Sequence, residues 1–449
     1  MAYAMDTKGR QKSKGGKQIV AAIDIGTTYS GYAYSFAHDF RKDPMKVYGI
    51  TNWFPGTVHL VTSKTPTILL LNNDKTFKAF GYEAENMYGE LQPEGVQKDY
   101  YYFKSFKIVL YNSLELKGDT EITDAFGRTM KAVKVFSIVI EYLKDHLYGG
   151  LKHILLDVDD NDIRWVLTVP AIWNDSCKQL MRDAAELAGI QKENLIIVLE
   201  PDAASLFCMH LPVARITMEG NMSDSMRVSP FSKGRKYMVV DAGGETVEIT
   251  IQEVIDSDKP NTLHSFGGAW GGTGVDAAYE NFLTTIIGEK TYDRFKTESA
   301  EDHIDLLRKF ETKKRGVIAG KTGKDVIKIP VCLADVYQET TGKGLKDRIC
   351  EIREYQDKVK WNGDKIRLDV DIVKSWFDKS CTDIVQLVKK IFHDDKSVGV
   401  NTILLVGGFS ESQMLQEAMK RNFPDKRLII PEEGSLMVLK GATIFGHTI

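Results

Sequence analysis

The sequence predicts an α/β protein made of two similar halves that face each other across a cleft. One motif, an apolar strand followed by Asp, Gly, a hydroxyl side chain and a second β-rich stretch, occurs twice, around Asp24 and around Asp241. The two copies lie about half the chain apart. In addition, a buried strand at residues 194–199 delivers Glu200 at its end, where doubly wound proteins place their chemistry. A glutamate that merely begins a helix is the alternative interpretation.

The first copy of the motif, at residues 19–34, reads as two β-strands joined by a tight turn. β-Branched and aromatic residues flank Gly26, which tolerates backbone conformations that other residues avoid. The turn presents backbone N–H groups and the hydroxyls of Thr27 and Thr28 at one point, which suits phosphate oxygens. Asp24 adds a hard oxygen suited to hydrated magnesium. An ordinary turn would look similar, but the second copy predicts two corners that hold one polyphosphate from both sides.

Composition places the chain among ordinary globular proteins. Its 449 residues are 43% hydrophobic and 27% charged, which suits about two to four domains, and the net charge of −3 gives no reason to expect nucleic-acid binding. Five scattered cysteines and nine histidines form neither a Cys-x-x-Cys nor a His-x-x-x-His pattern, which favours a reducing cytoplasm over a disulfide framework or a zinc site. No signal peptide or membrane-span pattern occurs, and the basic residues 1–18 read as a disordered tail.

The first half contains an unusual aromatic stretch at residues 100–108, in which Lys104 and Lys107 are set. Either the lysine stems lie along a packed aromatic face, or one lysine enters the cleft to neutralise a phosphoryl group. Around this stretch we expect strands at 67–71, 163–169 and 194–199, and helices at 131–148, 176–188 and 202–209.

The second half repeats strands and helices and adds two glycine-rich turns. The run 267–274 indicates backbone that passes close to a ligand, or else a flexible loop. Gly407-Gly408 follows a strand, and its bare backbone suits contact with a planar nucleoside ring. A charged helix at 300–318 reads by itself as a solvated face. We also expect a surface insertion at 218–236, strands at 326–331, 366–370, 402–406 and 428–430, and helices at 276–287, 373–392 and 435–445, with a Ser410/Gln413 capping box before a helix that ends near 422.

Seven stretches, in this order, resemble the nucleotide-binding domain of the heat-shock 70 kDa family. They are Asp24 to Ser30, Val169 to Asp175, Glu200 to Ala204, Asp241 to Gly244, Gly271 to Asp276, Glu311 to Arg315 and Val406 to Ser410. Three stretches, Trp165 to Trp173, Trp270 to Asp276 and Leu428 to Gly441, resemble the divergent 12A/12B-like branch of the family more than its ordinary chaperones. Each motif alone is weak or moderate, whereas the ordered set, which covers the chain from about Ile19, is specific.

The resemblance implies the actin-like two-lobe ATPase fold, in which two ribonuclease H-like domains are duplicated and each lobe is split into two subdomains. We expect lobe I at 19–235 with a subdomain insertion at about 51–129. Lobe II is expected at 236–430 with an insertion at about 267–368. Residues 431–449 would then form a closing segment that returns to lobe I. The family also implies bound ATP or ADP with Mg²⁺.

The resemblance assigns roles to residues that match the family motifs. Asp24, Glu200 and Asp241 would order magnesium through water and place the attacking water, and Lys107, or alternatively Lys104, would be the cleft lysine. The phosphate-binding residues would be Gly26, Thr27, Thr28 and Tyr29 from one lobe and Gly243, Gly244, Glu245 and Thr246 from the other. Gly271, Gly272 and Thr273 would border the ribose. Glu311, Lys314, Arg315, Gly407, Gly408, Phe409 and Ser410 would frame the adenosine.

Two departures from the family pattern affect the expected activity. Glu245 stands where a third glycine is usual and Glu248 where an aspartate is usual, and a carboxylate beside the phosphates would repel the γ-phosphate. We also expect no β-rich peptide-binding domain within this sequence. We therefore expect a weak magnesium-dependent ATPase whose lobes close on nucleotide, acting as a cytoplasmic monomer with protein partners or co-chaperones. The alternatives are a nucleotide-sensing scaffold that does not hydrolyse ATP and, with less support, a sugar or metabolite kinase of the same fold.

Overall fold

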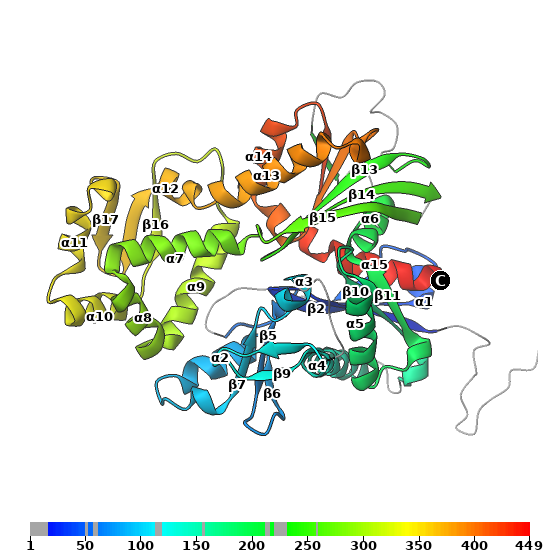
Figure 1. Ribbon diagram of the computed structural model, residues 1–449, viewed down its shortest axis with the longest axis horizontal. Coiled ribbons are helices and arrows are strands. Elements are labelled where there is room, and N and C mark those ends of the chain that lie inside the picture. Colours follow the sequence, from blue (N-terminus) through cyan, green and yellow to red (C-terminus); the bar gives the residue numbers. More distant parts are fainter. Residues whose placement is uncertain are drawn as a thin grey trace, which may run out of the picture.

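Two six-stranded sheets form the centres of two lobes (Figure 1). This computed structural model describes residues 17–49, 53–56, 62–112, 119–154, 158–211, 216–219, 231–256 and 259–449. Most of the expected basic tail and most of the expected insertion at 218–236 lie outside these residues. No helix within the described ranges is long and apolar enough to cross a membrane.

The sheet of lobe I has the strand order β11-β10-β1-β2-β3, with β4 also paired to β2. Its strands are β1 (Ile19–Ile25), β2 (Tyr29–Phe36), β3 (Tyr48–Gly49), β4 (Thr65–Pro66), β10 (Ile163–Val169) and β11 (Leu195–Leu199). Alternate residues of β1, such as Ile19, Ala21 and Ile23, share a core with α4 (Ala132–Lys152) and α5 (Asp175–Leu187). The Asn174 side chain accepts a hydrogen bond from the backbone N–H of Cys177 and so caps α5.

The sheet of lobe II has the strand order β12-β20-β19-β13-β14-β15. Its strands are β12 (Ile216–Glu219), β13 (Lys236–Ala242), β14 (Val247–Asp256), β15 (Lys259–Gly268), β19 (Thr402–Val406) and β20 (Arg427–Pro431). One face of β13 shares a core with α7 (Thr273–Ile287), α13 (Asp378–Phe392) and α14 (Gln413–Asn422).

The two sheets are copies of one topology. In each, the first strand pairs antiparallel with the next one and parallel with a later one: β1 with β2 and β10, and β13 with β14 and β19. The turns share the same closing hydrogen bond: Gly26 N–H donates to Tyr29 O at 3.1 Å, and Gly243 N–H donates to Thr246 O at 3.0 Å. The predicted duplication is therefore present in the backbone as well as in the sequence.

Two helices lie between the sheets and join the lobes. The remaining faces of β1 and β13 share one core with α6 (Glu200–His210) and α15 (Met437–Thr448). The helices cross so closely that a Cβ atom on Gly441 would lie 1.7 Å from the carbonyl oxygen of Ala203. Arg164 Nη1 donates to the carbonyl oxygens of Gly446 and Ile449, which ties the end of α15 to β10.

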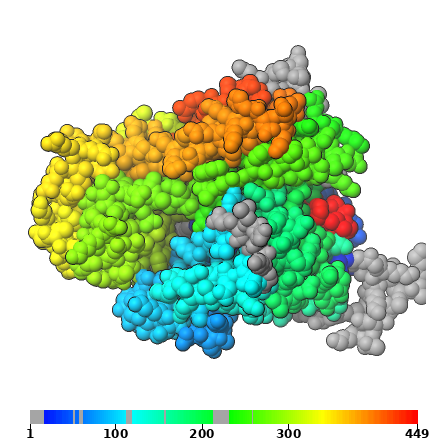
Figure 2. Space-filling model, in the orientation of Figure 1, coloured from blue at the N-terminus to red at the C-terminus, as the bar shows by residue number. Residues whose placement is uncertain are grey.

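Each lobe carries a second, smaller part, here called its arm. The lobe I arm contains β5 (Ile68–Leu71), β6 (Phe77–Phe80), α2 (Tyr82–Leu91), β7 (Tyr101–Lys104), α3 (Ile108–Asn112), β8 (Glu121–Thr123) and β9 (Thr129–Lys131). The lobe II arm contains α8 (Glu289–Glu298), α9 (Ala300–Arg315), β16 (Lys324–Lys328), α10 (Val331–Thr341), α11 (Leu345–Glu351), β17 (Val359–Asn362), β18 (Lys365–Asp369) and α12 (Val370–Ser375). The space-filling view shows the two arms facing each other (Figure 2).

Three local expectations are wrong. The strand expected at 326–331 ends at Lys328, because Pro330 caps a helix that begins at Val331. The helix expected at 373–392 is split between α12 and α13. Ser410 forms no capping box: its hydroxyl donates to Gly407 O at 2.6 Å, and Ser412 precedes α14 instead.

Candidate functional site

A cavity of about 420 Å³ lies between the lobes, where the two matching turns meet. It receives residues from both halves of the duplication and from the end of α9. The predicted site residues that line it are Asp24, Gly26, Thr27, Thr28, Tyr29, Lys107, Glu200, Asp241, Gly243, Gly244, Thr246, Arg315, Gly407 and Gly408. The structure thus brings together residues that are far apart in the sequence.

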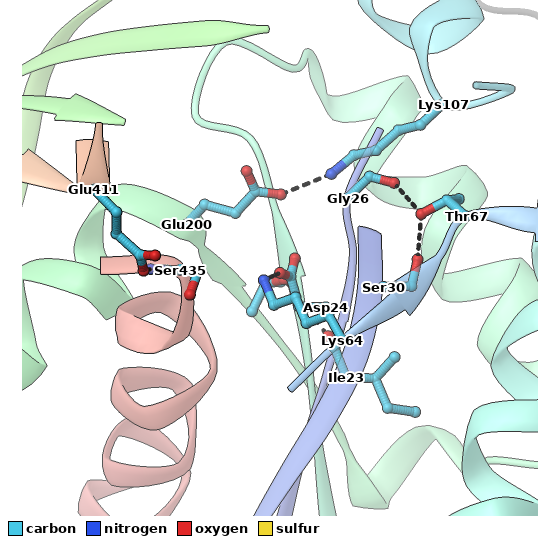
Figure 3. Close-up of polar contacts among 11 residues, drawn as sticks. Ile23, Asp24, Gly26, Ser30, Lys64, Thr67, Lys107, Glu200, Glu411 and Ser435 are labelled. Atoms are coloured by element: carbon cyan, nitrogen blue, oxygen red, sulfur yellow. Dashed lines mark hydrogen bonds and ion pairs between the residues drawn. The ribbon is translucent and has the colours of Figure 1, made fainter. Parts of the chain in front are cut away.

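The two turns touch each other at the cavity wall. A Cβ atom on Gly244 would lie 2.1 Å from Thr28 Oγ1, so only glycine allows this approach. Thr28 Oγ1 is buried and has no hydrogen-bond partner within the described part of the chain. The Thr67 hydroxyl donates to Gly26 O at 2.8 Å and contacts Ser30 Oγ at 2.7 Å, which holds the first turn in place (Figure 3). A buried hydroxyl without a partner is suited to receive a ligand oxygen.

Asp24 lies at the end of β1 with both carboxylate oxygens engaged. Lys64 Nζ lies 2.6 Å from Oδ2, and the Thr168 hydroxyl donates to Oδ1 at 2.8 Å. Burial alone would raise the pKa of Asp24, but the positive charges of Lys64 and Lys107 outweigh it, so the pKa lies below its ordinary value. Asp24 is therefore an ionised carboxylate at the base of the cavity near neutral pH.

Lys107 reaches into the cavity from the aromatic stretch and pairs with Glu200. Its Nζ lies 2.8 Å from Glu200 Oε1 (Figure 3). The same Nζ lies 5.2 Å from the centre of the Trp173 ring. Lys107 is buried, whereas Lys104 is exposed and lines a neighbouring cavity. Burial raises the pKa of Glu200 even though Lys107 opposes this shift. Of the two lysines considered from the sequence, Lys107 is the one beside Glu200.

Asp241 and Glu248 add two carboxyl groups from the second turn. Burial, reinforced by the charges of Glu200 and Asp24, raises the pKa of Asp241 to about 7. Burial, with Glu200 and Asp241 as neighbours, raises the pKa of Glu248 to about 8. The backbone N–H of Ile172 donates to Glu248 Oε1 at 2.7 Å, while Oε2 has no partner in the described ranges. The cavity floor therefore holds four carboxyl groups, two of which give up their protons near neutral pH.

Glu245 points across the cleft. Its carboxylate accepts a hydrogen bond from Ser105 of the opposite lobe, and burial raises its pKa. The expected repulsion of phosphates is therefore weaker than the sequence indicates, because the side chain has a partner on its other side. Ser105 itself has a φ of 53°, a strained value for a residue other than glycine.

A second cavity, of about 580 Å³, continues from the first between the arms. Glu311, Lys314 and Arg315 line it from α9, and Gly272, Thr273 and Phe409 line it from lobe II. Lys314 Nζ lies 2.8 Å from Asp276 Oδ1 and 2.6 Å from Glu311 Oε2, and Arg315 Nε lies 2.7 Å from Glu311 Oε1. This charged segment is therefore an ordered ion-pair network, contrary to the solvated face that composition alone suggests.

Gly407 and Gly408 line the first cavity, whereas the predicted site residues Gly271 and Ser410 line neither cavity. Gly407 has a φ of 88°, and a Cβ there would lie 2.3 Å from Asp241 Oδ1. A Cβ on Gly271 would lie 2.3 Å from Gly244 O, and Thr273 N–H donates to that same oxygen at 2.7 Å. These close approaches lock the second turn against the glycine-rich run.

Several residues of the site were not predicted from the sequence. Lys64 and Thr168 hold Asp24, and Glu411 accepts a hydrogen bond from Ser435 N–H at 3.0 Å at the far end of the cavity (Figure 3). Thr168 directly precedes Val169, the first residue of a stretch that resembles the family, so the sequence offered a signal for it. Lys64 gives no local signal, because it lies in an irregular stretch without periodicity. No group of three or more His, Cys, Asp or Glu side chains in the described ranges is arranged to hold a metal ion directly.

Comparison with known proteins gives consistent matches. A family model described as Hsp70 protein matches residues 72–330. Heat shock 70 kDa protein 12A of Mus musculus is 32% identical over 95% of this chain and 69% of its own length. Heat shock 70 kDa protein 12B of Homo sapiens is 31% identical over 96% of this chain and 68% of its own length. Chaperone protein DnaK of Mycoplasmopsis pulmonis is 23% identical over 96% of this chain and 59% of its own length. The chain therefore belongs to the Hsp70 family, has the actin-like ATPase fold of that family, and is similar to its 12A and 12B branch.

Proposed function

We propose that the cavity between the lobes binds ATP and ADP and that the protein hydrolyses ATP slowly. The observation that supports this most is the meeting of the two matching turns, at Thr28 and Gly244, on one cavity. Each turn offers backbone N–H groups and hydroxyls to the same space, as a polyphosphate requires. The second cavity, with Arg315 and Gly408, has room for the nucleoside.

Hydrolysis would depend on charge placement around the transferred phosphoryl group. Lys107 is held by Glu200 and supplies positive charge from lobe I. Asp241 lines the cavity, and its carboxyl group forms no hydrogen bond or ion pair with another side chain in the described ranges. Phosphoryl transfer needs positioning and electrostatic stabilisation more than covalent chemistry. The half-buried carboxylate of Glu245 works against negative charge at the same place, which favours slow turnover, whereas Glu248, whose pKa is raised to about 8, is mostly protonated near neutral pH and adds little repulsion.

Magnesium stays a prediction, and the site as it stands does not fit the expected arrangement. That arrangement needs Asp24, Glu200 and Asp241 free to hold water around the ion. Lys64 and Thr168 each donate one hydrogen bond to Asp24, and Lys107 donates one to Glu200, so the positive charges of the two lysines lower the attraction of both carboxylates for a hydrated cation. Of the three, only Asp241 has no such partner among the described residues, and the residues present therefore fit a magnesium ion poorly.

Calorimetry with ADP and ATP, followed by phosphate-release kinetics, tests the proposed function. We expect binding of both nucleotides, and we expect Lys107→Met to lower turnover by about 100-fold because one charge that stabilises the transition state is lost. Lys104→Met is the matched control, since it removes an exposed lysine of the same stretch. If wild-type phosphate release were no faster than that of Asp241→Ala, the proposed hydrolysis would be refuted and the proposed nucleotide binding would stand. Absence of nucleotide binding would contradict the proposal as a whole.

The second candidate is a scaffold that senses nucleotide without hydrolysing it. Glu245 favours it, since its contact with Ser105 links the second turn to the opposite lobe and would transmit nucleotide binding as a change in lobe contact. Tight binding without turnover, together with a protein partner that dissociates when nucleotide is removed, would support this candidate. A cytoplasmic location, a monomeric state and the domain limits given above also remain proposals.

A further inference from the structure

The side chain of Lys64 lines the base of the proposed nucleotide cavity and is held in place by its surroundings. The residue directly precedes β4, and the pairing of Thr65 with Ser30 fixes its place beside β2. Its side chain is only 16% exposed, and its Nζ lies 2.6 Å from Asp24 Oδ2. A Cβ on Gly31 would lie 3.0 Å from Lys64 Cγ, so glycine leaves room for the lysine stem. Lys64 is thus held by backbone pairing, by packing and by charge.

This ammonium group lies on the carboxylate that a bound divalent cation would be expected to use. The other Asp24 oxygen receives the Thr168 hydroxyl at 2.8 Å, and the positive charge of Lys64 lowers the attraction of Asp24 for a hydrated cation. An ammonium group has three donors, so after one bond to Asp24 it retains two for phosphate oxygens. Lys64 and Lys107 both line the cavity and together supply two positive charges, the same charge as one magnesium ion.

We propose that Lys64 acts as a built-in cation at the phosphate site, so that this protein binds nucleotide with little dependence on divalent metal. The inference rests on the proposed nucleotide binding. In it, the ammonium group of Lys64 bridges Asp24 and a phosphate oxygen, and Lys107 bridges Glu200 and another. Magnesium would still bind nucleotide in solution, but the protein would gain little from it.

The competing explanation is that Lys64 is a structural ion pair that merely neutralises a buried aspartate. Both explanations predict that loss of Lys64 lowers stability, because it leaves Asp24 buried without its partner. Only the built-in cation predicts that loss of Lys64 also changes the metal dependence of binding. The experiment therefore compares metal dependence between variants instead of activity.

The test measures ADP affinity of the purified chain by calorimetry, once with excess magnesium and once with EDTA. We expect the wild-type affinities to differ by less than about threefold. We expect Lys64→Met, which keeps the stem and removes the charge, to lose about tenfold or more in EDTA and to recover in magnesium. Lys64→Arg should keep the wild-type pattern. Lys46→Met is the control, because Lys46 forms an ion pair of similar length with Asp39, 2.8 Å, outside the cavity lining.

Thermal unfolding of each variant first establishes that it is folded at the temperature of the titration. A wild-type loss of tenfold or more in EDTA would overturn the inference, and so would equal metal dependence of Lys64→Met and wild type. In both cases nucleotide binding itself would stand. If ADP bound in neither buffer, the proposed function would fail and the role of Lys64 with it.

Discussion

The contact between Thr28 and Gly244 gives the sharpest test of the nucleotide site. Gly244→Ala adds one methyl group where the two turns meet. That methyl carbon would lie 2.1 Å from Thr28 Oγ1 and 2.6 Å from Thr28 Cβ, whereas ordinary contact begins at 3.4 Å. Gly244 is not among the residues with positive φ, so the substitution adds no backbone strain of that kind. The turns must separate by about 1 Å.

The second turn cannot absorb this shift alone. Gly244 O accepts a hydrogen bond from Thr273 N–H at 2.7 Å, and Gly243 O accepts one from Gly272 N–H at 3.1 Å. Movement of the turn would break both bonds, so we expect the lobes to part instead. Since misplacement by about 1 Å costs as much as 100-fold in positioned chemistry, we expect ADP affinity to fall by about 10- to 100-fold.

Calorimetry with ADP measures the effect, and Gly149→Ala is the matched control. Gly149 is an exposed residue of α4, and a Cβ there meets nothing within 4 Å. Thr28→Gly should weaken binding by itself, because it removes the unpartnered hydroxyl, but adding Gly244→Ala to it should cost little more. If Gly244→Ala bound ADP within about threefold of wild type, the two turns would not hold the same ligand.

Three further predictions concern neighbouring features. Arg308→Ala breaks a buried ion pair between the arms, so nucleotide should dissociate at least ~10-fold faster in stopped-flow release. Arg294→Ala breaks an exposed ion pair within one arm and should leave the dissociation rate unchanged. Equal dissociation rates in wild type and both variants would contradict a role of Arg308 in holding the arms together. Burial, with nearby lysines, lowers the pKa of His303 from 6.5 to about 4, so the neutral imidazole costs no stability above pH 6.5, and the free energy of unfolding falls by about 3 kcal/mol as the pH drops toward 4. His303→Phe should reduce the pH dependence of the melting temperature between pH 6.5 and 4, and an unchanged pH dependence would refute this. Glu245→Gln keeps a partner for Ser105 and removes a charge, so calorimetry should show ATP affinity several-fold higher, whereas unchanged affinity would mean that this carboxylate does not act on the phosphates.

The duplication was predictable because its two copies use the same local chemistry. Asp24 and Asp241 end apolar strands, and the glycines after them are required by tight turns that the sequence marks clearly. The pairing of β1 with β2 and of β13 with β14 follows from short-range geometry. Such signals survive in a single sequence, since the interacting residues lie close together along the chain.

The arms were harder to predict, because tertiary packing decides their structure. The helices α10 and α11 lie in a polar segment rich in glycine and lysine between two expected strands. The helix α2 follows a strand, and its N-cap residue, Gly81, forms no side-chain capping hydrogen bond. Apolar residues of these two helices, such as Leu333 of α10 and Leu345 of α11, are buried in the core that the lobe II arm shares with α7, instead of following a long amphipathic period. Lys64 is hidden for a related reason: its partner Asp24 lies in another strand, and the ion pair exists only in the folded chain.

The cross-lobe contacts explain why nucleotide binding and lobe position should be coupled in this protein. The shared core of α6 and α15 joins the lobes at the base of the cleft, and Arg308, only 8% exposed, joins the arms through Glu85 and Pro55 O. The cavity lies between these attachments, so a ligand that fills it acts on both. The core is apolar, whereas the arms are joined by the packing of α2 against α9 and by the Arg308 guanidinium group, whose removal leaves Glu85 without its partner. We therefore expect opening to begin at the arms, and a ligand held by both turns should oppose it most strongly.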